Sequence, residues 1–261
     1  MKLTFLGTGT SFGIPVVGCD CAACTSADPR DRRTRHGALL ALDRGTLLVD
    51  TPPELRLQLL AAGVRRVDAV WFTHLHADHI HGIDDLRVFT VRRGDLDAWV
   101  AAEYRERMAR YFEYIFDEGY EPLAGTSKPR VRLHELHPGE PREILGATFH
   151  PVEVPHGLVR VYGFRVGGLG YVTDGKSLPE AARASLEGVD VLVLNALWFG
   201  RTHPSHFNVE EAVEAARSVG ARRTFLTHLT HRVTHVELLR RLPPGVEPAY
   251  DGLTIEVPDH V

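Results

Sequence analysis

The chain has 261 residues, with 30 Lys and Arg against 34 Asp and Glu, so its formal charge is −4 with neutral histidines. Hydrophobic residues make up 44% and charged residues 25%, which excludes a disordered chain, a collagen and a disulfide scaffold. The mild excess of acid argues against tight electrostatic binding to nucleic acid or to an anionic membrane. The 15 histidines and three closely spaced cysteines are instead a composition typical of metal ligands.

The start of the chain, residues 1–7, lacks a basic segment followed by a long apolar stretch, so we expect no signal peptide. No run of about 18 apolar residues occurs in the sequence, so no membrane span is expected. Cys19, Cys21 and Cys24 lie within six positions and, being odd in number, cannot all pair as disulfides. They fit reduced thiolates around a metal, and hence a cytoplasmic protein.

Short apolar runs predict strands at residues 3–6, 38–42, 46–49, 69–73, 148–154, 161–166, 171–173, 191–194, 223–227 and 254–257. Helices are expected at 53–62, 209–219 and 234–241, the second with Asn208 as its cap and Glu211 in the capping-box position. A further helix is expected over 99–116, within an aromatic-rich insertion at about 94–129. This order favours a layered α/β sandwich, with one domain spanning residues 1–261.

Four ligand-type side chains follow the predicted strand at 69–73 within six residues: His74, His76, Asp78 and His79. Because residues at i and i+2 point apart on a helix, we expect these four on a loop that wraps around a metal centre. Imidazole together with carboxylate suits Zn, Mn or Fe.

Three later strands also run into a ligand-type residue, namely His156, Asp174 and His228. Sites in open α/β sheets form at this edge. Five histidines and two aspartates exceed the four ligands of a single zinc, and they suit two ions about 3.5–4 Å apart that clamp a bridging water. The expected ligands are His74, His76 and His156 for one ion, Asp78, His79 and His228 for the other, and Asp174 as the bridge.

This ligand series, His-x-His-x-Asp-His followed by His156, Asp174 and His228, resembles that of the metallo-β-lactamase superfamily. The resemblance implies an αββα sandwich of two face-to-face mixed sheets with helices outside. It also implies a dinuclear hydrolase, and it gives Asp50, at the end of a strand, a supporting role beside the metal loop.

Further motifs resemble those of the PhnP-like phosphodiesterases: the glycine-rich opening at 7–15, Cys-x-Cys-x-x-Cys at 19–24, Asp-Asp-Leu-Arg at 84–87, His-Pro-Ser-His at 203–206 and Leu-Thr-His-Leu-Thr-His at 226–231. The resemblance implies that His231 completes a structural zinc site with the three cysteines. It also implies small or cyclic phosphodiester substrates and a homodimer. His206 matches a family residue near the leaving group and is the expected proton donor. The expected catalytic residues are Asp78 and His206.

The expected activity is phosphodiester hydrolysis by a hydroxide that bridges two Mn, Zn or Fe ions. One alternative is a transfer-RNA 3′-processing nuclease, which would need a basic patch, whereas residues 99–120 carry three Arg against five acids. Another is a non-catalytic, PqqB-like carrier, which predicts an incomplete ligand set. Thioester or lactam hydrolysis rests only on the shared metal motif. The remaining histidines are expected at the surface or in turns: His36, His134, His137, His150, His235 and His260.

Overall fold

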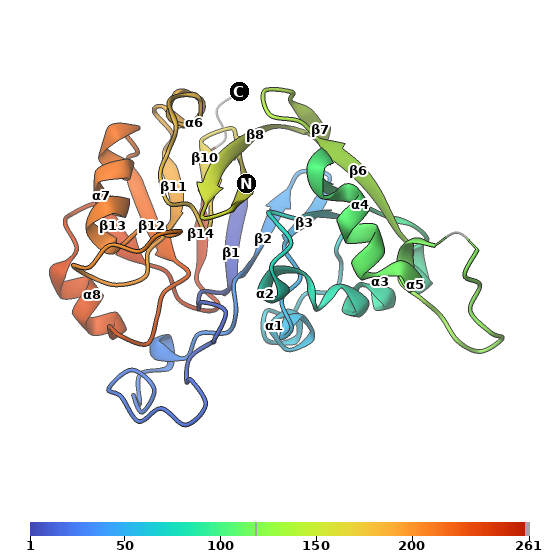
Figure 1. Cartoon of the computed structure of the whole chain (residues 1–261), viewed down its shortest axis with the longest axis horizontal. Helices are drawn as coiled ribbons and strands as arrows, with labels where there is room; N and C mark the ends of the chain where they lie inside the picture. Colours follow the sequence, from blue (N-terminus) through green and yellow to red (C-terminus); the bar gives the residue numbers. More distant parts are fainter. Residues whose placement is uncertain (118, 259–261) are drawn as a thin grey trace.

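Two seven-stranded mixed β-sheets lie face to face in the computed structural model, which describes residues 1–117 and 119–258 (Figure 1). The first sheet has the order β14 (Thr254–Glu256), β1 (Lys2–Gly7), β2 (Gly37–Leu42), β3 (Gly45–Val49), β4 (Ala69–Trp71), β5 (Leu96–Ala101) and β6 (Val131–Leu136). The second has the order β13 (Val246–Pro248), β12 (Arg223–Thr227), β11 (Val191–Asn195), β10 (Leu169–Val172), β9 (Val159–Val166), β8 (Ala147–His156) and β7 (Arg142–Ile144).

Side chains alternate between the two faces of each strand, and the central strands are apolar on both faces. On β3, Leu47 joins the cluster between the sheets, whereas Leu48 joins the cluster under the helices of the first sheet. On β11, Val193 belongs to the inner cluster and Leu194 to the outer one. A strand buried on both faces reads as a continuous apolar run, which is why these strands are visible in the sequence.

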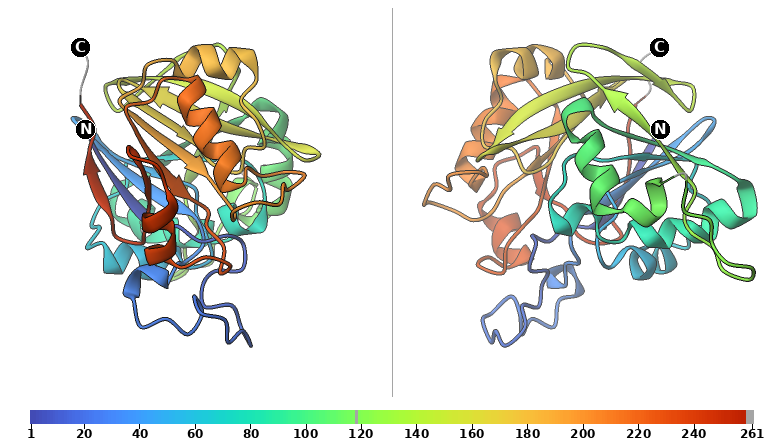
Figure 2. Two further views of the ribbon diagram at one scale, coloured as in Figure 1. Left: turned by 90° about the vertical axis from the view of Figure 1, so that its left-hand side faces the viewer. Right: turned by 45° about the vertical axis from the view of Figure 1, so that its right-hand side comes forward.

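Helices cover the outer face of each sheet (Figure 2). The first sheet packs against α1 (Leu55–Ala61), α2 (Ala77–Ile80), α3 (Arg87–Arg93), α4 (Ala102–Tyr111) and α5 (Glu113–Phe116), and the second against α6 (Glu180–Leu186), α7 (Val209–Ser218) and α8 (His235–Arg241). Two 3₁₀ turns, Pro29–Asp31 and Ile83–Leu86, complete the elements. These four layers confirm the predicted αββα sandwich. None of the helices in the described ranges combines the length and the apolar character that a membrane span needs.

The predicted helix over 99–116 is wrong at its start. Trp99 lies in β5, which pairs in parallel with β4 on one side and β6 on the other, and α4 begins only at Ala102. Leu96, Ala98 and Val100 are buried on alternate positions, which is a strand pattern that the nearby aromatic residues obscure. The prediction also omits β6, β7, β13, α3 and α6. What lies outside the sheet is α4, α5 and the connection to β6.

The strands that precede ligand-type residues end at two neighbouring sheet edges. In the second sheet, β8 and β10 both run antiparallel to β9, and β10, β11 and β12 run parallel to one another, so β8, β10 and β12 share a direction. In the first sheet, β3 and β4 are parallel. Side chains that follow these five strands can therefore converge at the same end of the sandwich.

Candidate metal centre

The cluster after β4 is part loop and part helix. His74 and His76 lie on the loop, and His76 is the N-cap of α2, whose single turn carries Asp78 and His79. The expectation that all four lie on a loop is therefore wrong for Asp78 and His79. The i, i+2 argument applies to His74 and His76, whereas the adjacent pair Asp78 and His79 fits within one helical turn. Three of the four side chains are buried, and His76 is exposed.

Left-handed backbone marks the strand ends at this centre. Asp50 after β3, Asp174 after β10 and His228 after β12 have φ of 61°, 55° and 53°, and Leu145 is the one other described non-glycine residue with positive φ. Each such residue costs about 1–3 kcal/mol and persists only where its surroundings fix it. Strain concentrated at three strand ends indicates that this region is built for function.

The carboxylate of Asp174 lies at the middle of the cluster. Its Oδ2 is 3.3 Å from His79 Nε2, 3.8 Å from His74 Nε2 and 3.9 Å from His156 Nε2, and its Oδ1 is 3.3 Å from His228 Nε2. Ligands 2.0–2.2 Å from a tetrahedral ion lie about 3.4 Å apart, so these spacings match atoms arranged around a metal. Three groups of side chains here each bring their ligand atoms within 4.8 Å of one another: His74, His76, His156 and Asp174; Asp78, His79 and His228; and Asp174, His206 and His228.

Hydrogen bonds orient three of the histidines from behind. His79 Nδ1 donates to Asp50 Oδ2 at 2.6 Å, and His156 Nδ1 donates to the carbonyl of Ser205 at 2.9 Å. Thr73 Oγ1 lies 3.1 Å from His74 Nδ1. Fixing the far nitrogen in this way sets the tautomer and leaves Nε2 as the nitrogen whose lone pair a metal can bind.

Several buried nitrogens of the cluster have no hydrogen-bond partner among the described residues: His79 Nε2, His206 Nε2 and both ring nitrogens of His228. Buried polar atoms are normally paired, so a concentration of unpaired nitrogens calls for an explanation. The donor set of imidazoles and carboxylates fits a bound divalent ion, which would engage Nε2 of His79 and Nε2 of His228.

The charges of the cluster also favour a cation. Burial opposes the charge of Asp174, but His228 and His79 hold the pKa of this carboxyl well below its usual value. Burial likewise disfavours protonated His79, but Asp174, Asp78 and Asp50 raise the pKa of its imidazole well above the usual value. Burial lowers the pKa of His74, so this side chain is a neutral imidazole, the form that binds metals.

His206 lies at the edge of the same cluster. Its Nε2 is 3.5 Å from Asp174 Oδ2, and its ring stacks on that of His228 with centroids 5.1 Å apart. The loop that carries it leads into α7, where Asn208 and Glu211 form the predicted capping box. Burial lowers the pKa of His206.

The three cysteines form a second group of ligand atoms with His231. Cys19 Sγ and Cys21 Sγ lie 3.3 and 3.4 Å from His231 Nδ1, and all four ligand atoms lie within 4.8 Å of one another. The cysteines are free thiols. A hydrogen bond from the backbone of Cys24 lowers the pKa of Cys21 to about 6, which favours the thiolate form that metals bind.

The expectation of a surface or turn position is wrong for His36 and His235, which are buried. His36 Nε2 lies 2.7 Å from the hydroxyl of Tyr171, and its Nδ1 lies 3.3 Å from Thr227 Oγ1. These partners are 135 and 191 residues away along the chain, so no local pattern could reveal them. Of the other four, His134 and His137 are half-buried, His150 is exposed and His260 lies outside the described residues.

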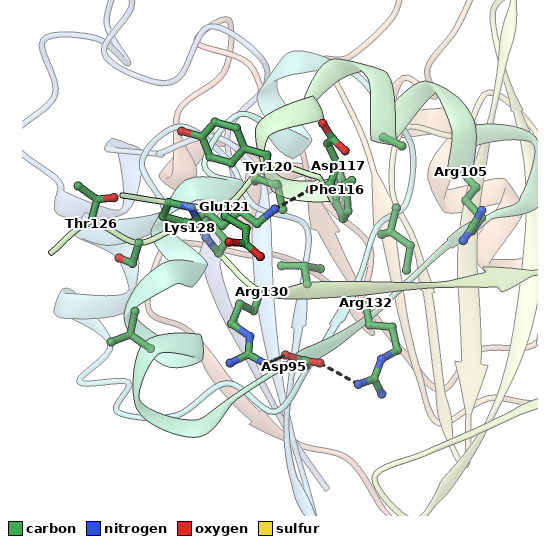
Figure 3. A pocket seen from close by; sticks show the side chains of 18 residues that line it. Asp95, Arg105, Phe116, Asp117, Tyr120, Glu121, Thr126, Lys128, Arg130 and Arg132 are labelled. Atoms are coloured by element: carbon green, nitrogen blue, oxygen red, sulfur yellow. Dashed lines mark hydrogen bonds and ion pairs between the residues drawn. The ribbon is translucent and has the colours of Figure 1, made fainter. Parts of the chain in front are cut away.

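A sizeable pocket lies away from the metal cluster. It has a volume of about 940 Å³ and is lined by residues of α4, α5, β6 and the connection between them, with no ligand-type histidine among its walls (Figure 3). Its cationic side chains are already engaged: Arg130 and Arg132 lie 2.6 and 2.9 Å from the two oxygens of Asp95, and Lys128 donates to the carbonyl of Asp117. The metal cluster is therefore the better candidate for the functional site.

Similarity to known proteins agrees with this geometry. The family model described as the β-lactamase superfamily domain matches residues 46–229, so the chain belongs to the metallo-β-lactamase superfamily. The crystal structure of a diphosphatase from the PhnP family is 38% identical, covers 97% of this chain and 96% of that chain, and has a TM-score of 0.89. Within the superfamily the chain therefore belongs to the PhnP family, as its motifs predict.

Two further relatives differ in name and length. An octanoyltransferase of Porphyromonas gingivalis is 35% identical over 255 residues, which are 97% of this chain and 51% of that protein, so the chain spans about half the length of this relative. A ribonuclease Z of Methanothermobacter thermautotrophicus is 24% identical, over 98% of this chain and 97% of that protein.

Replacing Asp50 with Ala should weaken divalent-metal binding at this cluster by about 10- to 100-fold, because His79 loses the carboxylate that fixes its tautomer. The measurement is a chelator-competition titration of metal-free protein with Zn²⁺. The Asp97→Ala variant serves as the control, since Asp97 pairs with His134 away from the cluster. Unchanged affinity in the Asp50 variant would show that His79 does not depend on Asp50.

Proposed function

We propose that this protein is a metal-dependent phosphodiesterase that hydrolyses small or cyclic phosphodiesters. The observation that carries this proposal is the convergence of seven ligand-type side chains, with unpaired buried nitrogens, at the shared end of the two sheets. The PhnP-family diphosphatase supports it, because hydrolysis of a diphosphate and hydrolysis of a phosphodiester both break a P–O bond and release an oxygen leaving group.

His74, His76 and His156 would hold one divalent ion, Asp78, His79 and His228 the other, and Asp174 would lie between the two sets. When bound, ions of this kind would lower the pKa of a water molecule bound to them and would neutralise the charge that builds on the phosphoryl oxygens. Zn, Mn and Fe all suit this donor set. The carboxylates of Asp78 and Asp174 balance part of the added positive charge.

His206 would donate a proton to the leaving oxygen. It lies beside Asp174 but outside the two ligand sets above, on a loop anchored by the capping box of α7. Burial lowers the pKa of this imidazole, which makes its protonated form a stronger acid, and the negative charge of a bound phosphodiester favours that form.

Hydrolysis of bis(p-nitrophenyl) phosphate tests the proposal. After chelation the purified protein should be inactive, and Mn²⁺ or Zn²⁺ should restore diesterase activity with little activity on p-nitrophenyl phosphate. Asp174→Ala should lower kcat by about 100-fold or more, because it removes the carboxylate between the two ligand sets. Metal-replete wild-type protein without diesterase activity, or an Asp174→Ala variant with normal turnover and full metal content, would contradict the proposal.

The role of His206 predicts a dependence on the leaving group. His206→Ala should lower kcat by about 100-fold or more for a 2′,3′-cyclic nucleotide, whose alkoxide needs a proton. The loss for bis(p-nitrophenyl) phosphate should be much smaller, because nitrophenolate leaves without one. Metal content is measured in parallel, since His206 also groups with Asp174 and His228 as a possible ligand. Equal losses on both substrates, or a loss of metal, would exclude the proton-donor role.

We also propose that Cys19, Cys21, Cys24 and His231 hold a structural zinc, since four such ligands leave no open position. Cys24→Ser should lower the zinc content by one ion per chain and lower the melting temperature. The neighbouring Thr25→Ser variant, which keeps the hydroxyl that donates to the Cys21 carbonyl, is the matched control and should retain its zinc. Full zinc content in the Cys24 variant would refute the assignment.

A transfer-RNA 3′-processing nuclease is the second candidate, favoured by the ribonuclease Z relatives. The net charge of −2 over residues 99–120 argues against it, because RNA binding needs a basic patch. Salt-sensitive binding of a precursor transfer RNA would favour the nuclease. The carrier alternative predicts an incomplete ligand set, which does not match the seven residues gathered here. The homodimer and the cytoplasmic location stay predictions.

A further inference from the structure

A fully buried histidine lies behind the metal cluster and contributes no ligand atom to it. His36 immediately precedes β2 in the first sheet, and its side chain is wholly inaccessible. Its Nε2 lies 2.7 Å from the hydroxyl of Tyr171 on β10, and its Nδ1 lies 3.3 Å from Thr227 Oγ1 at the end of β12. One imidazole therefore joins the first sheet to two strands of the second sheet.

The partners of His36 adjoin the residues that the metal site needs. Thr227 is bonded to His228, and Tyr171 lies three residues before Asp174. The ring of His36 also packs against two predicted ligands directly: its centroid is 5.5 Å from that of His79 and 6.2 Å from that of His228. The side chains of His79, on α2, and of His228, after β12 of the second sheet, thus share one neighbour.

Burying an imidazole is costly unless its nitrogens are paired. A neutral imidazole has one N–H and one bare nitrogen, so it donates to one of its two hydroxyl partners and accepts from the other. Both nitrogens of His36 are used in this way, and neither is left for a metal. An apolar side chain of similar size would fill the space but would make neither hydrogen bond, so it would not link β10 and β12 to the first sheet.

We propose that His36 is a positioning residue that holds His79 and His228 at the separation required by the ligand group Asp78, His79 and His228. This inference rests on the proposed metal assignment. It predicts that His36 matters for the affinity of that one group, while the group of His74, His76 and His156 keeps its ion without it.

The test is a titration of metal-free protein with Co²⁺, in which absorption bands of nitrogen- and oxygen-ligated cobalt are separated from the thiolate charge-transfer bands of the cysteine site. Wild-type protein should bind two ions in the former class. In His36→Leu, one of the two should bind about 10- to 100-fold more weakly, as loss of a supporting contact does at other metal sites, and the other should be unchanged. Tyr171→Phe, which removes only the 2.7 Å contact, should show the same change to a smaller extent.

Two further variants separate positioning from general stability. His36→Gln keeps a donor and an acceptor and should recover most of the lost affinity. His235→Leu removes another buried histidine, which packs against Tyr250 and Arg33, and should lower stability without changing the cobalt titration. If His36→Leu fails to fold, His36→Gln and Tyr171→Phe still report on the two contacts.

The proposal is overturned if both cobalt affinities in His36→Leu equal those of wild-type protein, or if both fall together. Where that variant does not fold, the proposal is overturned if Tyr171→Phe titrates as wild-type protein does. Because no substrate is present, absence of diesterase activity does not affect this result. Failure of wild-type protein to bind two nitrogen- and oxygen-ligated ions would instead refute the metal assignment itself.

Discussion

Two carboxylates buried among histidines at the shared end of the sheets set the constraint on which this structure depends. Asp174 is 1% exposed and Asp78 is 8% exposed, and removing a carboxylate from water costs several kcal/mol unless positive charge lies beside it. Without a metal ion the positive charge falls to His79, whose pKa is raised by Asp174, Asp78 and Asp50. The cluster thus favours a cation, and a proton and a metal compete for the same imidazole.

The surrounding fold holds these buried carboxylates and histidines in place. Asp50 accepts hydrogen bonds from the backbone and hydroxyl of Thr73 at 2.8 Å each, in addition to the one from His79. One carboxylate therefore fixes both the start of the metal loop and the far nitrogen of a predicted ligand. The left-handed backbone at Asp50, Asp174 and His228 is tolerated because such contacts, together with ladders on both sides, leave each strand end few alternatives.

The sequence alone predicts much of this architecture, for a physical reason. Strands buried on both faces appear as continuous apolar runs, and the ligand-type residues stand shortly after them, so β4, β10 and β12 can each be read locally. The strand β5 could not be read in this way, because its short alternating pattern adjoins a helix rich in aromatic residues. His36 shows a second limit. Its role depends on Tyr171 and Thr227, which are distant in the chain and become its neighbours only when the two sheets pack.

The histidine and aspartate cluster and the cysteine group are joined through one short segment that follows β12. His228 belongs to the histidine and aspartate cluster, and His231, three residues later, belongs to the cysteine group. Between them, Leu229 donates to the carbonyl of Thr8 at 2.8 Å and accepts from the amide of Thr10 at 3.3 Å. The glycine-rich opening of the chain is thus paired with the residue next to His228, while the cysteine loop that follows it is held against His231. A closed Cys₃His site would stabilise this segment at its far end without exposing an ion to substrate. Because the segment begins at a residue with strained backbone, restraint at His231 and pairing at Leu229 both help to keep His228 where the cluster needs it.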